Sequence, residues 1–307
     1  RLNDSGSITA AWLAENSMIR LPDGREVMAP ADRWVVFNDS RKIMQVPILN
    51  NTKIRLPDGR EVMAEPCLPG PLRFNDAGKL KYVHLAEKTK VTLPDGTEVV
   101  AKADGWLEFN DTGKLVELCM ADNTKVKLPD GTGVFAEFLE FNDAGQVIEA
   151  WLSKDTKLKL SDGTEVVARG YSGTPLKFNA AGKITELTLV DNVRLELFDG
   201  TEIVVSSIQF NAAGVISGMR LAEDTKLKLP KGQEVVAKKE SLLGLNNNGR
   251  IISIAFQEDA EIELPDGAKV NATSIEFNDT GRIIRVQLTE NTRVKLPEGS
   301  YALVNDL

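Results

Sequence analysis

Hydrophobic and polar residues alternate over short stretches along the whole chain. In residues 124–128 (Thr-Lys-Val-Lys-Leu), Val126 and Leu128 share one face, and in residues 97–101 Val99 and Ala101 do the same. A period of two residues is typical of a β-strand with one buried face. The pattern therefore predicts an all-β protein built from short, half-buried strands.

Two turn motifs separate these strands at a regular spacing. An apolar residue followed by Asn, and usually by Asp-x-Gly, begins at Leu2, Phe37, Phe74, Phe109, Phe141, Phe178, Phe210, Leu245 and Phe277. Leu-Pro-Asp-Gly or a close variant begins at Leu21, Leu56, Leu93, Leu128, Leu160, Leu197, Leu229, Leu264 and Leu296. The step from the first motif to the second is 19 residues in every copy, whereas the return step varies from 13 to 18. The chain therefore contains nine tandem units of 32–37 residues.

Leu-Pro-Asp-Gly has the chemistry of a tight chain reversal. Pro presets φ at the first turn position, Asp bonds back to the backbone, and Gly adopts the left-handed conformation. A three-residue loop places the residue before Leu opposite the second residue after Gly. These positions carry opposite charges in five copies, such as Arg20/Glu26 and Glu263/Lys269, which supports the register, while Glu196/Glu202 does not fit.

The Asn motif predicts a second hairpin in each unit. Asn is present in all nine copies and can cap the turn, and Gly follows in eight. Arg41 replaces that Gly in the second copy, so we expect a strained or different turn there. Apolar residues fall two, five and seven positions past Gly, as in Leu80, Val83 and Leu85, and this change of parity predicts a bulge.

Four strands in about 34 residues cannot enclose a core alone, so neighbouring units must stack. We expect one repeat array over residues 1–307, forming an elongated solenoid or superhelical array of four-stranded hairpin units. A closed propeller-like ring is the alternative, because four strands per unit also characterise propeller blades. Open strand edges favour self-association or contact with neighbouring domains.

The turn motif resembles that of known bacterial repeats. Residues 277–283 (Phe-Asn-Asp-Thr-Gly-Arg-Ile) and 74–80 (Phe-Asn-Asp-Ala-Gly-Lys-Leu) resemble the Tyr-Asp-x-x-Gly-Arg-Leu signature of YD (Rhs-type) repeats and the hairpins of bacterial MORN-like repeats. They differ from the YD pattern by Phe for Tyr and Asn for Asp, and the Leu-Pro-Asp-Gly half has no counterpart. The resemblance implies an exported bacterial β-hairpin protein, secreted or on the cell surface.

Composition argues against several function classes. The net charge is −8, which disfavours a nucleic-acid partner, and no apolar stretch is long enough to span a membrane. One histidine, two cysteines at different repeat phases and no nucleophile or phosphate-binding motif leave no catalytic residue, metal site or cofactor to propose. Each Pro-Asp-Gly offers one carboxylate with a turn role, although cation binding between stacked copies is an alternative. We therefore expect a protein that is not an enzyme.

Irregular loops are the candidate recognition surface, because insertions in a repeat array often form its binding face. They contain Trp34, residues 66–71, Trp106, Tyr171 and residues 238–240. Trp34, Trp106 and Tyr171 could stack on sugar rings or anchor a protein, or simply cover hairpin ends. We expect Trp12 and Trp151, at strand positions, to pack across strands. The leading hypothesis is a non-enzymatic structural or adhesive scaffold, and the alternative is a carbohydrate- or protein-binding module.

Overall fold

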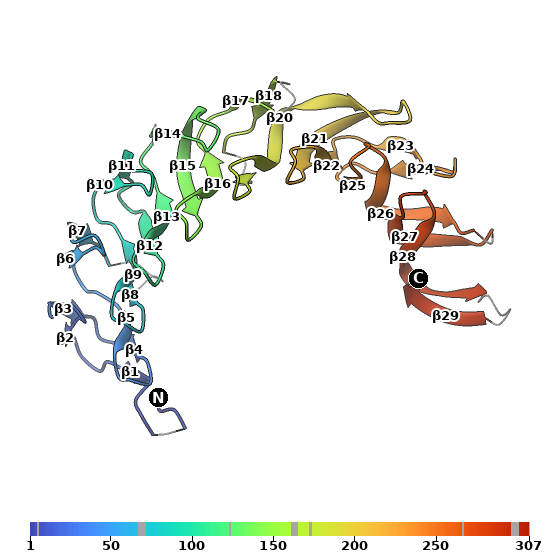
Figure 1. The fold of residues 1–307 in the computed structure, drawn as a ribbon. Coiled ribbons are helices and arrows are strands. Elements are labelled where there is room, and N and C mark those ends of the chain that lie inside the picture. Colours follow the sequence, from blue (N-terminus) through green and yellow to red (C-terminus); the bar gives the residue numbers. More distant parts are fainter. Residues whose placement is uncertain are drawn as a thin grey trace. The chain divides into compact units, whose positions relative to one another are not determined.

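The chain folds entirely into β-strands and turns. The computed structural model describes residues 1–4, 6–66, 72–122, 124–160, 165–171, 174–265, 267–295 and 301–306, and every regular element in them is a strand (Figure 1). The prediction of an all-β hairpin repeat is confirmed. Contacts divide the chain into two compact units, residues 1–154 with 180–182, and residues 155–179 with 183–307.

In unit 1, the Asn hairpins join edge to edge into an antiparallel main sheet. Neighbouring strands in order are β1 (Ala10–Trp12), β4 (Trp34–Phe37), β5 (Ile43–Val46), β8 (Leu72–Phe74), β9 (Leu80–His84), β12 (Trp106–Phe109), β13 (Leu115–Cys119), β15 (Gly133–Phe141) and β16 (Val147–Leu152).

The Leu-Pro-Asp-Gly hairpins of unit 1 form two-stranded ladders, of which three are separate from the main sheet and the fourth shares β15 with it. They are β2 (Ser17–Arg20) with β3 (Glu26–Ala29), β6 (Thr52–Arg55) with β7 (Glu61–Ala64), β10 (Thr89–Thr92) with β11 (Glu98–Ala101), and β14 (Lys125–Lys127) with the first half of β15.

Unit 2 repeats this plan with longer strands. It contains β17 (Thr156–Lys159), β18 (Glu165–Ala168), β19 (Leu176–Phe178), β20 (Ile184–Glu196), β21 (Glu202–Phe210), β22 (Ile216–Leu221), β23 (Thr225–Lys228), β24 (Glu234–Ala237), β25 (Leu242–Leu245), β26 (Ile251–Glu263), β27 (Lys269–Phe277), β28 (Ile283–Lys295) and β29 (Tyr301–Asp306). The three copies with a 13-residue return step have no room for a loop. Their two hairpins therefore share one continuous strand, namely β15, β21 and β27.

The predicted register of the Leu-Pro-Asp-Gly hairpins is confirmed in all nine copies, from Arg20 opposite Glu26 to Lys295 opposite Tyr301. Several ion pairs, however, run diagonally rather than straight across. Arg194 Nη1 lies 2.9 Å from Glu202 Oε2, which accounts for the facing pair Glu196/Glu202: the neutralising charge comes from two residues earlier. The turns at 161–163 and 297–299 lie outside the described residues.

The Asn hairpins carry the predicted bulge. In copies two to nine the register shifts immediately before the apolar residue of the motif, for example between Glu108 and Phe109. Of the two expected outcomes at Arg41, a strained or a different turn, the structure shows the first: the Arg41 amide donates to the Asn38 carbonyl at 2.9 Å, as in the glycine turns. Its φ of 60° shows that the expected strain is present.

Five of the proline-tipped hairpins pack on the Asn turn two repeats further along. A Cβ atom added to the turn glycine would lie 2.8 Å from the proline Cβ for Pro22/Gly78 and Pro57/Gly113. The distance would be 2.5 Å for Pro94/Gly145, Pro129/Gly182 and, in unit 2, Pro230/Gly281. Glycine is therefore required at these turns both by its φ and by the proline above it.

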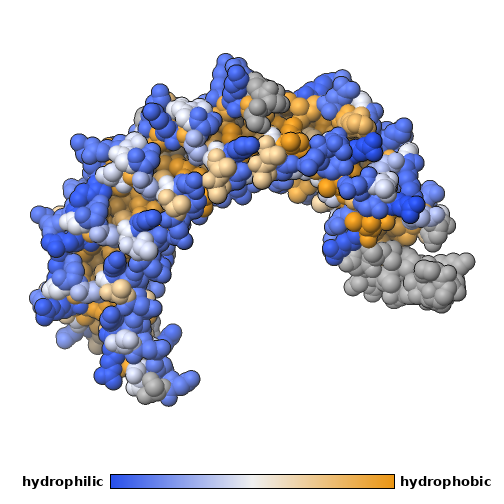
Figure 2. Space-filling view, viewed as in Figure 1, coloured by the Kyte–Doolittle hydropathy of each residue, from blue (hydrophilic) through white to orange (hydrophobic). Residues whose placement is uncertain are grey.

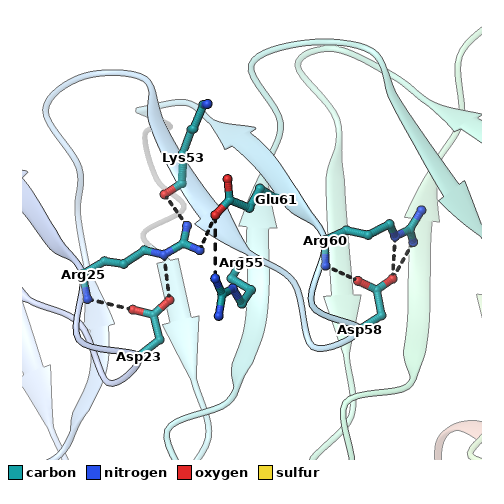
Figure 3. Close-up of polar contacts among 7 residues, drawn as sticks. All are labelled: Asp23, Arg25, Lys53, Arg55, Asp58, Arg60 and Glu61. Atoms are coloured by element: carbon teal, nitrogen blue, oxygen red, sulfur yellow. Dashed lines mark hydrogen bonds and ion pairs between the residues drawn. The ribbon is translucent and has the colours of Figure 1, made fainter.

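Neighbouring repeats are also joined by side-chain hydrogen bonds. Asn38 Oδ1 accepts from the Lys42 amide inside its own turn, while Asn38 Nδ2 donates to Asp76 Oδ1 of the next turn at 2.9 Å. Between the proline hairpins, Arg25 donates to the Lys53 carbonyl and to Glu61, 3.1 and 2.7 Å away (Figure 3). These contacts set the spacing between consecutive copies.

The core lies between the proline hairpins and the main sheet. Its members alternate with exposed residues, as in Val99 and Ala101 or Leu107 and Phe109, all of which are buried. Figure 2 shows the hydrophobic residues gathered in a band between hydrophilic margins. The opposite face of the main sheet stays open to solvent, and it carries the candidate site.

Gly113→Ala tests the packing across two repeats. The variant needs both a left-handed alanine and displacement of Pro57, which together cost about 2–4 kcal/mol. Gly96→Ala is the matched control, because Gly96 has a φ of 87° but nothing within 4 Å of its Cβ position. Denaturant unfolding should show a clearly larger loss for Gly113→Ala, and equal losses would contradict the packing.

Arg41→Gly should stabilise the chain. Glycine removes the left-handed strain of an exposed, non-glycine turn residue, a gain of about 1 kcal/mol. A rise in the urea midpoint would bear this out, and a fall would show that the Arg41 side chain makes a contact of greater value.

Candidate functional site on the open sheet face

Three half-buried aromatic rings cluster on the open face of the main sheet of unit 1. Trp106 begins β12, and Phe138 on β15 faces both Cys119 and Trp151 across the neighbouring strands. The ring centroids of Trp106 and Phe138 lie 5.7 Å apart, and those of Phe138 and Trp151 lie 4.6 Å apart. We call Trp106, Phe138 and Trp151 the aromatic row.

Four glutamates form a parallel line two residues away on the same face. Glu108 faces Glu117, Glu117 faces Glu140, and Glu140 faces Glu149, on β12, β13, β15 and β16. Side chains at directly opposed strand positions lie about 5 Å apart, so like charges there repel. Trp106 Nε1 donates to Glu117 Oε2 at 3.1 Å and ties the two lines together. We call these four residues the acidic row.

The surroundings of Glu108 and Glu140 disfavour ionisation of these two members of the acidic row. Partial burial, and then the neighbouring charge of Glu117, raise the pKa of Glu108 above its ordinary value, although Arg73 and Lys81 act in the opposite sense. Burial also raises the pKa of Glu140, and the charges of Glu149 and Glu117 add to that effect. The folded chain therefore keeps these carboxylates close together at a cost in free energy.

Trp34 occupies the same repeat position as Trp106, three residues before the motif phenylalanine. It faces Trp12 across β4 and β1, with ring centroids 5.3 Å apart and an interplanar angle of 69°. The guanidinium of Arg1 lies 4.7 Å from the Trp34 ring centroid. All four tryptophans of the chain thus lie on the open face of the same sheet, Trp12 and Trp34 at one end.

The sequence placed Trp34 and Trp106 in loops, whereas each is the first residue of a strand. The structure brings Trp34 to Trp12 and Trp106 to Phe138, and it confirms cross-strand packing for Trp12 and Trp151. Tyr171 belongs to unit 2 and is 73% exposed. Residues 67–71 and 172–173 of the candidate loops lie outside the described residues.

Sequence reasoning missed Phe138 and the acidic row. The signal was present, because Phe138 and Trp106 both stand three residues before the motif phenylalanine, and Glu108 and Glu140 both stand one before it. Reading each repeat phase down the nine copies would have shown two columns on one face. Their partners on the returning strands are Glu117, Glu149 and Trp151. These could be identified only with the exact register, which the bulge sets.

A cleft in unit 2 is a second feature of the surface. Copy six has Phe198 where other copies have Pro, and its Cβ stands 4.0 Å from the Cβ position of Gly249, a looser contact than under the prolines. A cleft of about 320 Å³ lies there, lined in part by Phe198, Pro230 and Arg250. The Arg250 guanidinium covers the Phe198 ring at 4.6 Å from its centroid.

The chemically reactive residues have structural partners. His84 is partly buried, and its Nδ1 lies at hydrogen-bonding distance, 2.6 Å, from Glu65 Oε1. Burial raises the pKa of the Cys119 thiol to about 11. The described part of the chain holds no group of three or more His, Cys, Asp or Glu side chains suited to a metal ion, and none of its elements is a helix able to cross a membrane.

Comparisons with known proteins leave the family open. No family model and no curated protein matches the chain. A protein of unknown function from Bacteroides caccae aligns over 71% of this chain and 87% of its own, at 14% identity and a TM-score of 0.14. TcdB2-TccC3 without its hypervariable C-terminal region aligns over 90% of this chain and 18% of its own, at 11% identity and a TM-score of 0.14. Neither likeness carries an argument, and the resemblance to YD or MORN-like repeats stays a resemblance of the turn motif.

Glu140→Gln tests the repulsion within the acidic row. Because the pKa of Glu140 is raised on folding, the folded chain binds more protons than the unfolded chain just above pH 4.5, and stability falls as pH rises through that window. Glutamine should therefore raise the free energy of unfolding measured in urea by less than about 1 kcal/mol at pH ~7 and have little effect at pH ~4. Glu223→Gln, at an exposed position of unit 2, is the control, and an equal response of both variants would contradict the repulsion.

Proposed function

We propose that the chain is a non-enzymatic scaffold of the structural or adhesive kind, which binds another macromolecule through the open face of unit 1. The observation that carries the proposal is the clustering of Trp106, Phe138 and Trp151 beside the acidic row. Aromatic rings at a solvent-exposed face are unfavourable unless a partner covers them, and tryptophan is enriched at the centres of binding interfaces.

The repeat architecture supports this role. Each repeat adds two hairpins to the array through the same contacts, so extended surfaces arise by repetition. Side chains at one repeat phase then line up across many strands, as the two rows do. The proposal keeps the bacterial, extracellular setting that the turn motif implies.

Array binding of the whole chain tests this function. We expect binding to one or more ligands on combined peptide and glycan arrays, with the signal lost in Trp106→Ala and in Trp151→Ala. Tyr171→Ala is the control, because Tyr171 is more exposed than either tryptophan but lies in unit 2. Loss of signal in Tyr171→Ala alone would contradict a site on the open face of unit 1 and place it at Tyr171. Arrays without any signal would overturn the proposed binding function.

A further inference from the structure

The acidic row begins next to an arginine that the chain itself supplies. Arg73 on β8 faces Tyr82 on β9, and Tyr82 faces Glu108 on β12. The Arg73 guanidinium lies over the Tyr82 ring, 4.5 Å from its centroid, and its charge favours ionisation of Glu108. At this end of the row, one cation therefore serves an aromatic ring and a carboxylate together.

Among the described residues, no arginine is recorded on Glu117 or Glu140 in the way that Arg73 lies beside Glu108. The row continues with Glu117, Glu140 and Glu149, and within the described residues no ion pair joins Glu117 or Glu140 to a basic side chain. In unit 2 the corresponding positions are balanced, since Lys177 faces Glu186 with an ion pair of 3.1 Å. Glu276 is likewise opposite a basic residue, Arg285, in the strand register. The row of four successively facing glutamates lies on β12, β13, β15 and β16.

One tryptophan of this face also has a cation over its ring. Arg1 lies over Trp34, which occupies the repeat position of Trp106. A guanidinium can stack on an aromatic ring and pair with a carboxylate through its planar fork, which a neutral hydroxyl ligand cannot do. The aromatic and acidic rows lie side by side at the spacing that such a side chain would bridge.

We propose that the open face of β12, β13, β15 and β16 binds a polypeptide segment that carries exposed arginine or lysine side chains. These side chains take the place on Glu117, Glu140 and the aromatic row that Arg73 takes on Glu108 and Tyr82. The inference rests on the proposed binding function and adds the chemistry of the partner.

Ring geometry favours a basic peptide over a glycan. The planes of Phe138 and Trp151 meet at 89°, and those of Trp106 and Phe138 at 49°. Rings packed edge to face do not form the flat, coplanar platform on which successive sugars would stack. They do leave individual ring faces next to carboxylates, which suits separate cationic side chains.

Titration of the full-length chain with defined probes tests the inference. The probes are three peptides of equal length in which glycine alternates with arginine, glutamine or glutamate, together with chitosan and cellulose oligosaccharides. We expect binding of the arginine peptide, weakened by added salt, and no binding of the glutamate peptide. Glu117→Gln combined with Glu140→Gln should weaken that binding at least about threefold, and Trp106→Ala should weaken it as well.

A second double variant distinguishes binding by the acidic row from attraction by the net charge of the chain. Glu87→Gln combined with Glu223→Gln removes the same charge from exposed corners of two other hairpins. Equal weakening by both double variants would show non-specific attraction to an acidic protein and would overturn the inference. Tryptophan-dependent binding of an oligosaccharide or of the glutamine peptide, unaffected by the Glu117 and Glu140 substitutions, would also overturn it while leaving the proposed function intact. Absence of any tryptophan-dependent ligand would defeat both.

Discussion

Contact between a proline-tipped hairpin and a glycine turn two repeats later is the constraint on which the fold depends. A hairpin of two four-residue strands cannot bury its apolar face alone, and a neighbour one repeat away covers only part of it. Because the proline tip contacts a turn two repeats away, it connects three consecutive repeats. The turn glycine is then fixed twice, by its left-handed φ and by the proline that occupies the space of a Cβ atom.

Variation between the copies follows from this constraint. Phe198 in place of Pro gives a looser contact with the turn two repeats later, and a cleft lies beside Gly249. The length of the return step, by contrast, affects only whether two hairpins share a strand. Sequence drift is therefore permitted in the loops and restricted at the turns.

Much of the fold could be predicted because turn chemistry and alternation are local properties. Pro-Asp-Gly and the Asn turn set the register of both hairpins, and the parity change past Gly revealed the bulge. Contacts between repeats could not be predicted, because nothing local shows that Pro57 meets Gly113 rather than Gly78. The same limit applies to the site: Trp106 was found as an exposed aromatic, but its neighbours Phe138, Glu117 and Trp151 come from other strands and require the pairing of β12, β13, β15 and β16.

The most direct test of the packing is a nuclear Overhauser experiment on a chain labelled only at glycine and proline. The fold requires cross-peaks between the Pro57 side chain and the Gly113 α-protons, and between Pro94 and Gly145, each pair separated by two repeats. Cross-peaks linking Pro57 instead to Gly78, one repeat away, or the absence of any proline to turn-glycine contact, would contradict it.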